Sequence, residues 1–201
     1  MNAIEALARL QSLNIPVLDT ADIAAALKQS SSAANKTVSR LAAAGLMTPV
    51  RHGVWWVGHQ VNLYRLPEFL TAPMPSYLSL QTALHLHGMV EQIPDVLYVV
   101  SLARAQRITT KVGVISVHRI APELFGGFEE LKDGVKLATA EKALFDLAYL
   151  STGRSRMFAA VPELEIPKTL RMRVLRHWVA RIPSSRSRTI VERQLDKWLS
   201  V

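Results

Sequence analysis

The side chains best suited to bind another molecule lie on one face of a helix predicted over residues 33–44. At 100° per residue, its apolar positions share about a third of the circumference, and they are Ala34, Val38, Leu41 and Ala42. The polar positions of the opposite face, which begins one residue earlier, are Ser32, Asn35, Lys36, Ser39 and Arg40. Each of these five can donate a hydrogen bond to a phosphate or a base edge, and none is acidic. The pattern predicts a helix that contacts double-stranded DNA.

Signals on either side make this helix the second of a helix-turn-helix. A shorter helix precedes it, with Thr20 as the predicted N-cap and Asp22 suited to its positive end. A serine-rich joint over residues 30–32 separates the two helices, and Gly45 fits the left-handed position that ends the second. The alternative is an ordinary helical hairpin with a solvated polar face.

Two short apolar runs around residues 51–53 predict a β-wing after the second helix. Gly53 suits a tight hairpin turn, which would bring Arg51 and His52 near a DNA backbone or minor groove. Trp55 and Trp56 are adjacent on the second wing strand, so they face opposite sides. The pattern leaves open which of the two is buried.

Enzymatic chemistry has little support in the sequence. His85 and His87 are two apart on a predicted helix, so their rings point about 200° apart and cannot share one ion. Glu141, Lys142 and Asp146 match the residue types of metal-dependent nucleases, but those acids lie on adjacent strands rather than on one helix. The pair at residues 126–127 lacks the wider spacing of a phosphate-binding loop. We therefore expect a protein without catalysis, metal or cofactor.

Composition suits a globular protein with an anionic partner. Apolar residues make up 49% of the 201 and charged residues 20%. The absence of cysteine excludes disulfides and thiolate metal sites and makes the cytoplasm the expected location. The first residues lack the pattern of a signal peptide, and no apolar run is long enough to span a bilayer, so we expect no membrane partner.

The net charge of +8 is concentrated at one end of the chain. Residues 1–58 carry +2, residues 59–150 carry −1 and residues 151–201 carry +7. A basic helical tail could extend a DNA contact, bind RNA or bind an acidic protein. A solvated surface with long arginine side chains is the alternative.

The periodicity beyond the wing predicts an α+β domain over residues 61–201, with its basic tail at 151–201, joined to a winged helix-turn-helix over 1–60. The predicted helices are residues 2–13, 77–87, 139–150, 168–182 and a last one from 189, and the predicted strands are 95–101, 112–119 and a hairpin over 129–138. Thr139 and Thr189 are predicted N-caps, and Gly88 ends the helix before it. Arg171 falls among apolar positions, so it must pair or extend to solvent.

Two linked segments in the middle of the chain resemble the AbiEi family, the antitoxins of type IV (abortive-infection) toxin–antitoxin systems. The first is PSYLSLQTALHLHG at residues 75–88, followed by EQIP at 91–94 and the strand VLYVV at 96–100. The second is ATAEKALFD at residues 138–146. The resemblance extends from the predicted winged helix to about residue 150.

The resemblance implies a DNA-binding repressor of its own operon. The repressor would bind inverted repeats, and its C-terminal domain would be needed for antitoxin activity. It would oppose a nucleotidyltransferase-like toxin without forming a stable complex with it. A positively charged C-terminal surface would add DNA contacts, and the positions here that could supply them are Arg173, Arg176, Arg181, Arg186 and Arg188. The alternative is a non-catalytic module that binds RNA or protein through the basic C-terminal helices.

Overall fold

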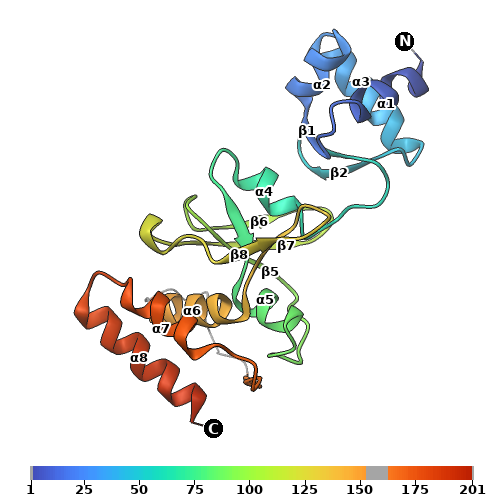
Figure 1. Ribbon diagram of the computed structural model, residues 1–201. Coiled ribbons are helices and arrows are strands. Elements are labelled where there is room, and N and C mark those ends of the chain that lie inside the picture. Colours follow the sequence, from blue (N-terminus) through green and yellow to red (C-terminus); the bar gives the residue numbers. More distant parts are fainter. Residues whose placement is uncertain (1, 153–162, 201) are drawn as a thin grey trace. The chain divides into compact units, whose positions relative to one another are not determined.

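Eight α-helices and two β-sheets make up the described part of the chain, residues 2–152 and 163–200 of the computed structural model (Figure 1). The fold is mixed α+β, as predicted. Contacts within the chain divide it into two units, Met1–Phe69 with Thr109–Gly113, and Leu70–Ile108 with Val114–Val201. No helix among the described residues has the length and apolar character that crossing a membrane requires.

The first unit packs three helices against a three-stranded sheet. Its elements in order are α1 (Ala3–Gln11), β1 (Val17–Asp19), α2 (Thr20–Leu27), α3 (Ser31–Ala43), β2 (Met47–Arg51) and β3 (Val54–Val57). The sheet is antiparallel with β3 in the centre. The helices meet through buried aliphatic side chains, among them Leu10, Ile23, Val38 and Leu41. Burial of these side chains fixes which face of α3 points outward.

The ends of α2 and α3 differ from the prediction by one or two residues. Asp19, not Thr20, is the N-cap of α2, and its carboxylate and that of Asp22 form a reciprocal capping box. The Asp19 carboxylate, one residue earlier, takes the capping role predicted for the Thr20 hydroxyl. That hydroxyl instead contacts Gly53 and Asn35. Ser30 caps α3, so this helix starts at Ser31 rather than at residue 33.

Both faces of strand β3 are covered. Trp55 pairs with Leu18 and packs on the core of the three helices, whereas Trp56 pairs with Val17 on the other face. Trp56 is 6% exposed and Trp55 is half-buried. Trp56 is therefore the more buried of the two, and the structure leaves neither ring fully open to solvent. Gly53 has φ +70°, as the predicted turn between β2 and β3 requires.

The second unit is built on a six-stranded mixed sheet of order β6-β7-β5-β4-β9-β8. The strands are β4 (Ser76–Leu78), β5 (Leu97–Ser101), β6 (Gln106–Thr109), β7 (Val114–Arg119), β8 (Phe128–Glu130) and β9 (Lys136–Ala138). The short helix α4 (Leu66–Thr71) begins in the first unit and ends in the second. The other helices are α5 (Leu80–Leu86), α6 (Ala140–Ser151), α7 (Met172–Ala180) and α8 (Ser185–Leu199), with a 3₁₀ turn at Pro122–Leu124. Helix α6 contacts α5, α7 and α8, and these four helices gather on one side of the sheet (Figure 1).

Several predicted elements of this unit are confirmed. The hairpin over residues 129–138 is present as β8 and β9, with Gly134 at φ +79° in its turn. The Thr139 hydroxyl accepts a hydrogen bond from the backbone N–H of Lys142 and so caps α6. Gly88 adopts φ +69° directly after the cap of α5.

Three predicted helix starts are wrong, and in the first two cases the residues before the helix have another role. Residues 76–78 form strand β4 at the centre of the sheet, and α5 begins only at Leu80. Arg171 lies before α7, where its backbone and guanidinium bind Glu141, so that helix starts at Met172 rather than at residue 168. Helix α8 begins at Ser185 under a Ser184 cap, four residues before the predicted Thr189.

Candidate nucleic-acid interface

Helix α3 presents the polar face that the sequence predicts. The side chains of Ser32, Asn35, Lys36, Ser39 and Arg40 are all exposed, whereas Ala34, Val38 and Leu41 are fully buried. No acidic residue occurs in this helix. The arrangement follows from the 3.6-residue period, because the aliphatic edge must be buried against α1 and α2. The exposed face therefore carries two cations and three neutral polar groups.

A shallow groove of about 680 Å³ runs along this face. Gln29, which the sequence analysis did not single out, lines it, and its side-chain oxygen accepts a hydrogen bond from the buried Thr37 hydroxyl at 3.1 Å. This hydrogen bond connects the segment between α2 and α3 to α3 itself. The position of Gln29 just after α2 is the signal that could have identified it.

The Thr20 hydroxyl links α3 to the turn between β2 and β3. It lies 3.3 Å from the carbonyl oxygen of Gly53 and 3.5 Å from the side-chain oxygen of Asn35. The first residue of α2 thereby sets the position of the turn relative to the exposed face of α3. Arg51 and His52, at this turn, are both exposed.

The five basic positions predicted in the C-terminal helices separate into two groups. Arg173, Arg176 and Arg186 are exposed and open to a partner. Arg181 is also exposed, but its guanidinium lies 4.7 Å from the centre of the Trp178 ring and donates to the carbonyl of Glu123. Arg188 donates to the carbonyl of Ile182 at 2.8 Å. Arg181 and Arg188 thus hold the ends of α7 and α8 in place.

A buried ion pair, Lys142 with Asp146, forms the polar centre of the second unit. Both side chains are 0% exposed. Oδ2 of Asp146 also accepts hydrogen bonds from the hydroxyls of Ser79 at 2.7 Å and Tyr77 at 3.0 Å. The ammonium of Lys142 lies 4.7 Å from the centre of the Trp178 ring and 4.9 Å from that of Phe145, within cation–π range. The bond to Asp146 is also the reason why Ser79 does not cap α5 with its side chain.

Burial has the largest influence on the ionisation of this cluster. It raises the pKa of the Asp146 carboxyl and lowers the pKa of the Lys142 ammonium, while the attraction between the two groups opposes both shifts. Burial also raises the pKa of Tyr77, and the neighbouring Asp146 charge adds to that shift. The raised pKa of Tyr77 favours the protonated hydroxyl, which donates to Asp146. These side chains are enclosed by the protein interior, so we interpret the cluster as a contribution to the stability of the fold.

Glu141 has a different partner from Asp146. Its carboxylate binds the backbone N–H and the guanidinium of Arg171, with the shortest side-chain contact at 2.9 Å. Burial alone would raise the pKa of Glu141, but the hydrogen bonds and charge of Arg171 outweigh it and lower the pKa to about 2. Arg171 therefore pairs, one of the two outcomes that its sequence position predicted. The three residues of the nuclease-like pattern therefore belong to two separate contacts, Glu141 with Arg171 and Lys142 with Asp146.

The two histidines of residues 85–87 have structural partners. A ring nitrogen of His85 lies 3.0 Å from the carbonyl oxygen of Val90, and one of His87 lies 2.7 Å from that of Ala138. The described residues contain no group of three potential ligands that could hold a metal ion.

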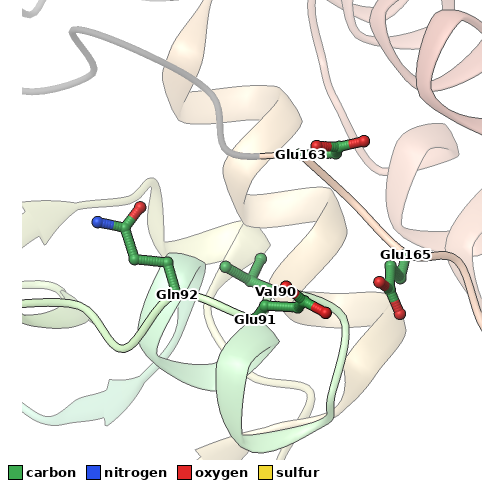
Figure 2. Close-up of a pocket in the computed structure, with 5 residues that line it drawn as sticks. All are labelled: Val90, Glu91, Gln92, Glu163 and Glu165. Carbon is green, nitrogen blue, oxygen red and sulfur yellow. The ribbon is translucent and has the colours of Figure 1, made fainter.

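The side chains of Glu91, Glu163 and Glu165 surround a separate cleft of about 650 Å³, together with Val90 and Gln92. Figure 2 shows Glu163 and Glu165 on one side of it and Gln92 on the other. The three carboxylates are exposed and give this cleft a negative charge. This cleft would repel a polyanion, so it is not part of the candidate nucleic-acid interface.

Replacing Gly127 with alanine tests how tightly the buried pair is enclosed. A Cβ atom at Gly127 would lie 2.6 Å from the Trp178 ring and 2.9 Å from Cγ of Lys142, and φ is +72°. We expect Gly127→Ala to lower the free energy of unfolding by about 2–4 kcal/mol through overpacking and left-handed backbone strain. Gly88→Ala is the matched control, because φ is +69° there but a Cβ would meet nothing within 4 Å. Equal losses in urea denaturation would contradict the packing argument.

No family model matches the sequence, and no curated protein matches it significantly. What the structure defines is an α+β protein of two units, the first of which exposes a basic, acid-free helix face.

Proposed function

We propose that this protein is a transcriptional repressor that binds operator DNA through a winged helix-turn-helix in its first unit. The observation that carries the proposal is the exposed face of α3, with five hydrogen-bond donors and no acid. The element order from α1 to β3, with two helices before a β-hairpin, suits this class. A 13-residue helix is about 20 Å long and fits a major groove about 12 Å wide.

The exposed side chains of α3 and the wing divide into those that would contact DNA bases and those that would contact the DNA backbone. Asn35 and Ser39 suit base edges, because an amide or hydroxyl can both donate and accept a hydrogen bond. Lys36 and Arg40 suit phosphate or guanine, and Ser32 lies in the first turn of α3, where free backbone N–H groups also favour phosphate. In the wing, Arg51 and His52 would contact the backbone or minor groove.

The antitoxin role is proposed from the resemblance of residues 75–100 and 138–146 to the AbiEi family. The protein would then repress its own operon in the cytoplasm and oppose a nucleotidyltransferase-like toxin without catalysis and without a stable complex. Identification of the neighbouring gene, followed by co-expression of its product with this protein, tests that role. Growth inhibition that this protein fails to relieve would contradict it.

The double variant Lys36→Ala with Arg40→Ala tests the DNA-binding proposal. We expect it to weaken binding to the upstream DNA by at least about tenfold, because a base contact by Arg40 alone corresponds to about 1–3 kcal/mol. Fluorescence anisotropy with labelled duplex measures the affinity. Arg9→Ala is the matched control, since Arg9 is an exposed cation on α1 of the same unit. Unchanged affinity in the double variant would refute the proposed interface.

A comparison with scrambled DNA separates the two kinds of contact. Asn35→Ala should reduce the preference for the cognate sequence, whereas Lys36→Ala should weaken binding to both sequences equally. If the Asn35→Ala variant keeps the full preference for the cognate sequence, Asn35 does not contact the bases.

The excess charge of the last 51 residues favours a second candidate, an RNA- or protein-binding module. Truncation cannot test it, because the core of the second unit contains buried side chains of α7 and α8 such as Leu175, Trp178 and Leu195. Neutralising the exposed arginines with Arg173→Gln and Arg186→Gln retains that core. If these changes abolish nucleic-acid binding while Lys36→Ala with Arg40→Ala has no effect, the second candidate is correct.

A further inference from the structure

A groove of about 460 Å³ lies between α7 and α8, outside the proposed DNA-binding face. One stripe of each helix forms it, at helical spacing: Met172, Leu175, Arg176, Val179 and Ala180 from α7, and Arg188, Glu192, Leu195, Asp196 and Leu199 from α8. Its floor is apolar, and Met172 at its margin is 36% exposed. In Figure 1, α8 lies at the outer edge of the second unit.

Charges of both signs line the groove, and the α8 wall includes Arg188, whose guanidinium donates to the carbonyl of Ile182. Arg176 stands on the α7 wall, and Glu192 and Asp196 stand on the α8 wall. All three are exposed, and within residues 2–152 and 163–200 none of the three has an ion-pair partner. An apolar floor between charged rims is the usual composition of a protein–protein interface.

We infer that a second copy of this chain occupies the groove. A purely basic or purely acidic partner would leave one wall facing a like charge. A two-fold axis parallel to the groove instead brings each copy's α7 wall against the α8 wall of its partner, so that Arg176 meets Asp196 twice. The α7–α8 hairpins of the two copies then form a four-helix contact in which the apolar floors cover each other.

Charge exchange tests this pairing without DNA in the sample, so the result is independent of the proposed function. Sedimentation velocity of the full chain over a concentration series measures the dimer dissociation constant. Arg176→Glu alone and Asp196→Arg alone each place like charges together, and we expect each to raise that constant at least about tenfold. The double variant, and an equal mixture of the two single variants, should restore dimers, because both cross-pairs are again of opposite sign.

Arg186→Glu is the control, because it reverses an exposed arginine of α8 that does not line the groove. It should leave the dissociation constant unchanged. Restoration in the mixture would also show that both single variants are folded. A wild-type chain that is monomeric at every concentration overturns the inference, and so does a pair of variants that weaken the dimer without restoring it together. If a different protein occupies the groove, the wild-type chain alone would be monomeric at every concentration.

Discussion

Asp146→Ala is expected to lower the free energy of unfolding by about 3–5 kcal/mol, the largest stability loss of any single change considered. The substitution leaves the Lys142 ammonium buried without its counter-ion, and it removes the acceptor for the hydroxyls of Ser79 and Tyr77. An uncompensated buried charge and unsatisfied donors are both costly in a low-dielectric interior. Urea denaturation and thermal melting measure the loss, with a melting temperature about 10 °C lower.

A double-mutant cycle distinguishes the pair from simple packing. Lys142→Met should also destabilise, because it leaves Asp146 without its cation, but Lys142→Met with Asp146→Asn should cost less than the sum of the two single changes. Asp95→Ala, an exposed aspartate before β5, is the control and should change the free energy by at most about 0.5 kcal/mol. Strict additivity in the cycle would show that the two side chains do not depend on each other.

DNA affinity is expected to fall about 500-fold between 50 and 200 mM salt. Five neutralised phosphates give a log–log slope near −4.5, because each basic contact releases about one counter-ion from the duplex. Three of the five would come from the first unit, namely Lys36, Arg40 and Arg51, and two from the exposed tail residues Arg173 and Arg186. Anisotropy titrations at several salt concentrations measure the slope.

The same titration assigns the tail its share of the affinity. Arg173→Gln with Arg186→Gln should reduce the slope to about −2.7, the value for three phosphates, if the tail binds the same duplex. Arg181 and Arg188 are not expected to contribute, because their guanidinium groups are bound to carbonyls of the chain. A wild-type slope near zero would exclude the proposed phosphate contacts altogether.

Local sequence signals predicted the helix ends and hairpin turns at which the backbone needs a positive φ. Gly45, Gly53 and Gly88 all adopt the positive φ that their predicted positions require, and Gly134 adopts it in the turn of the predicted hairpin. The polar face of α3 was also predictable, since the 3.6-residue period of its aliphatic positions determines which side chains must point outward. These features depend on residues within a few positions of each other.

Short strands and shared polar partners were not predictable in this way. Strands β4 and β6, of three and four residues, gain their stability from pairing with distant strands, and the segment of β4 has the same apolar character as the helix after it. Helix starts moved for the same reason, as when Arg171 bound Glu141 instead of extending α7.

The amino-acid sequence by itself determined the mixed α+β class, the outward face of α3 and the excess of positive charge near the C-terminus. Only the tertiary structure decided that Lys142 and Asp146 form a closed pair, and that Arg181 and Arg188 bind the chain while Arg173 and Arg186 face solvent. The physical reason is that a periodic pattern records which side of one element is buried. The partner of a buried charge, in contrast, comes from elements far away in the chain, and its identity depends on how they pack.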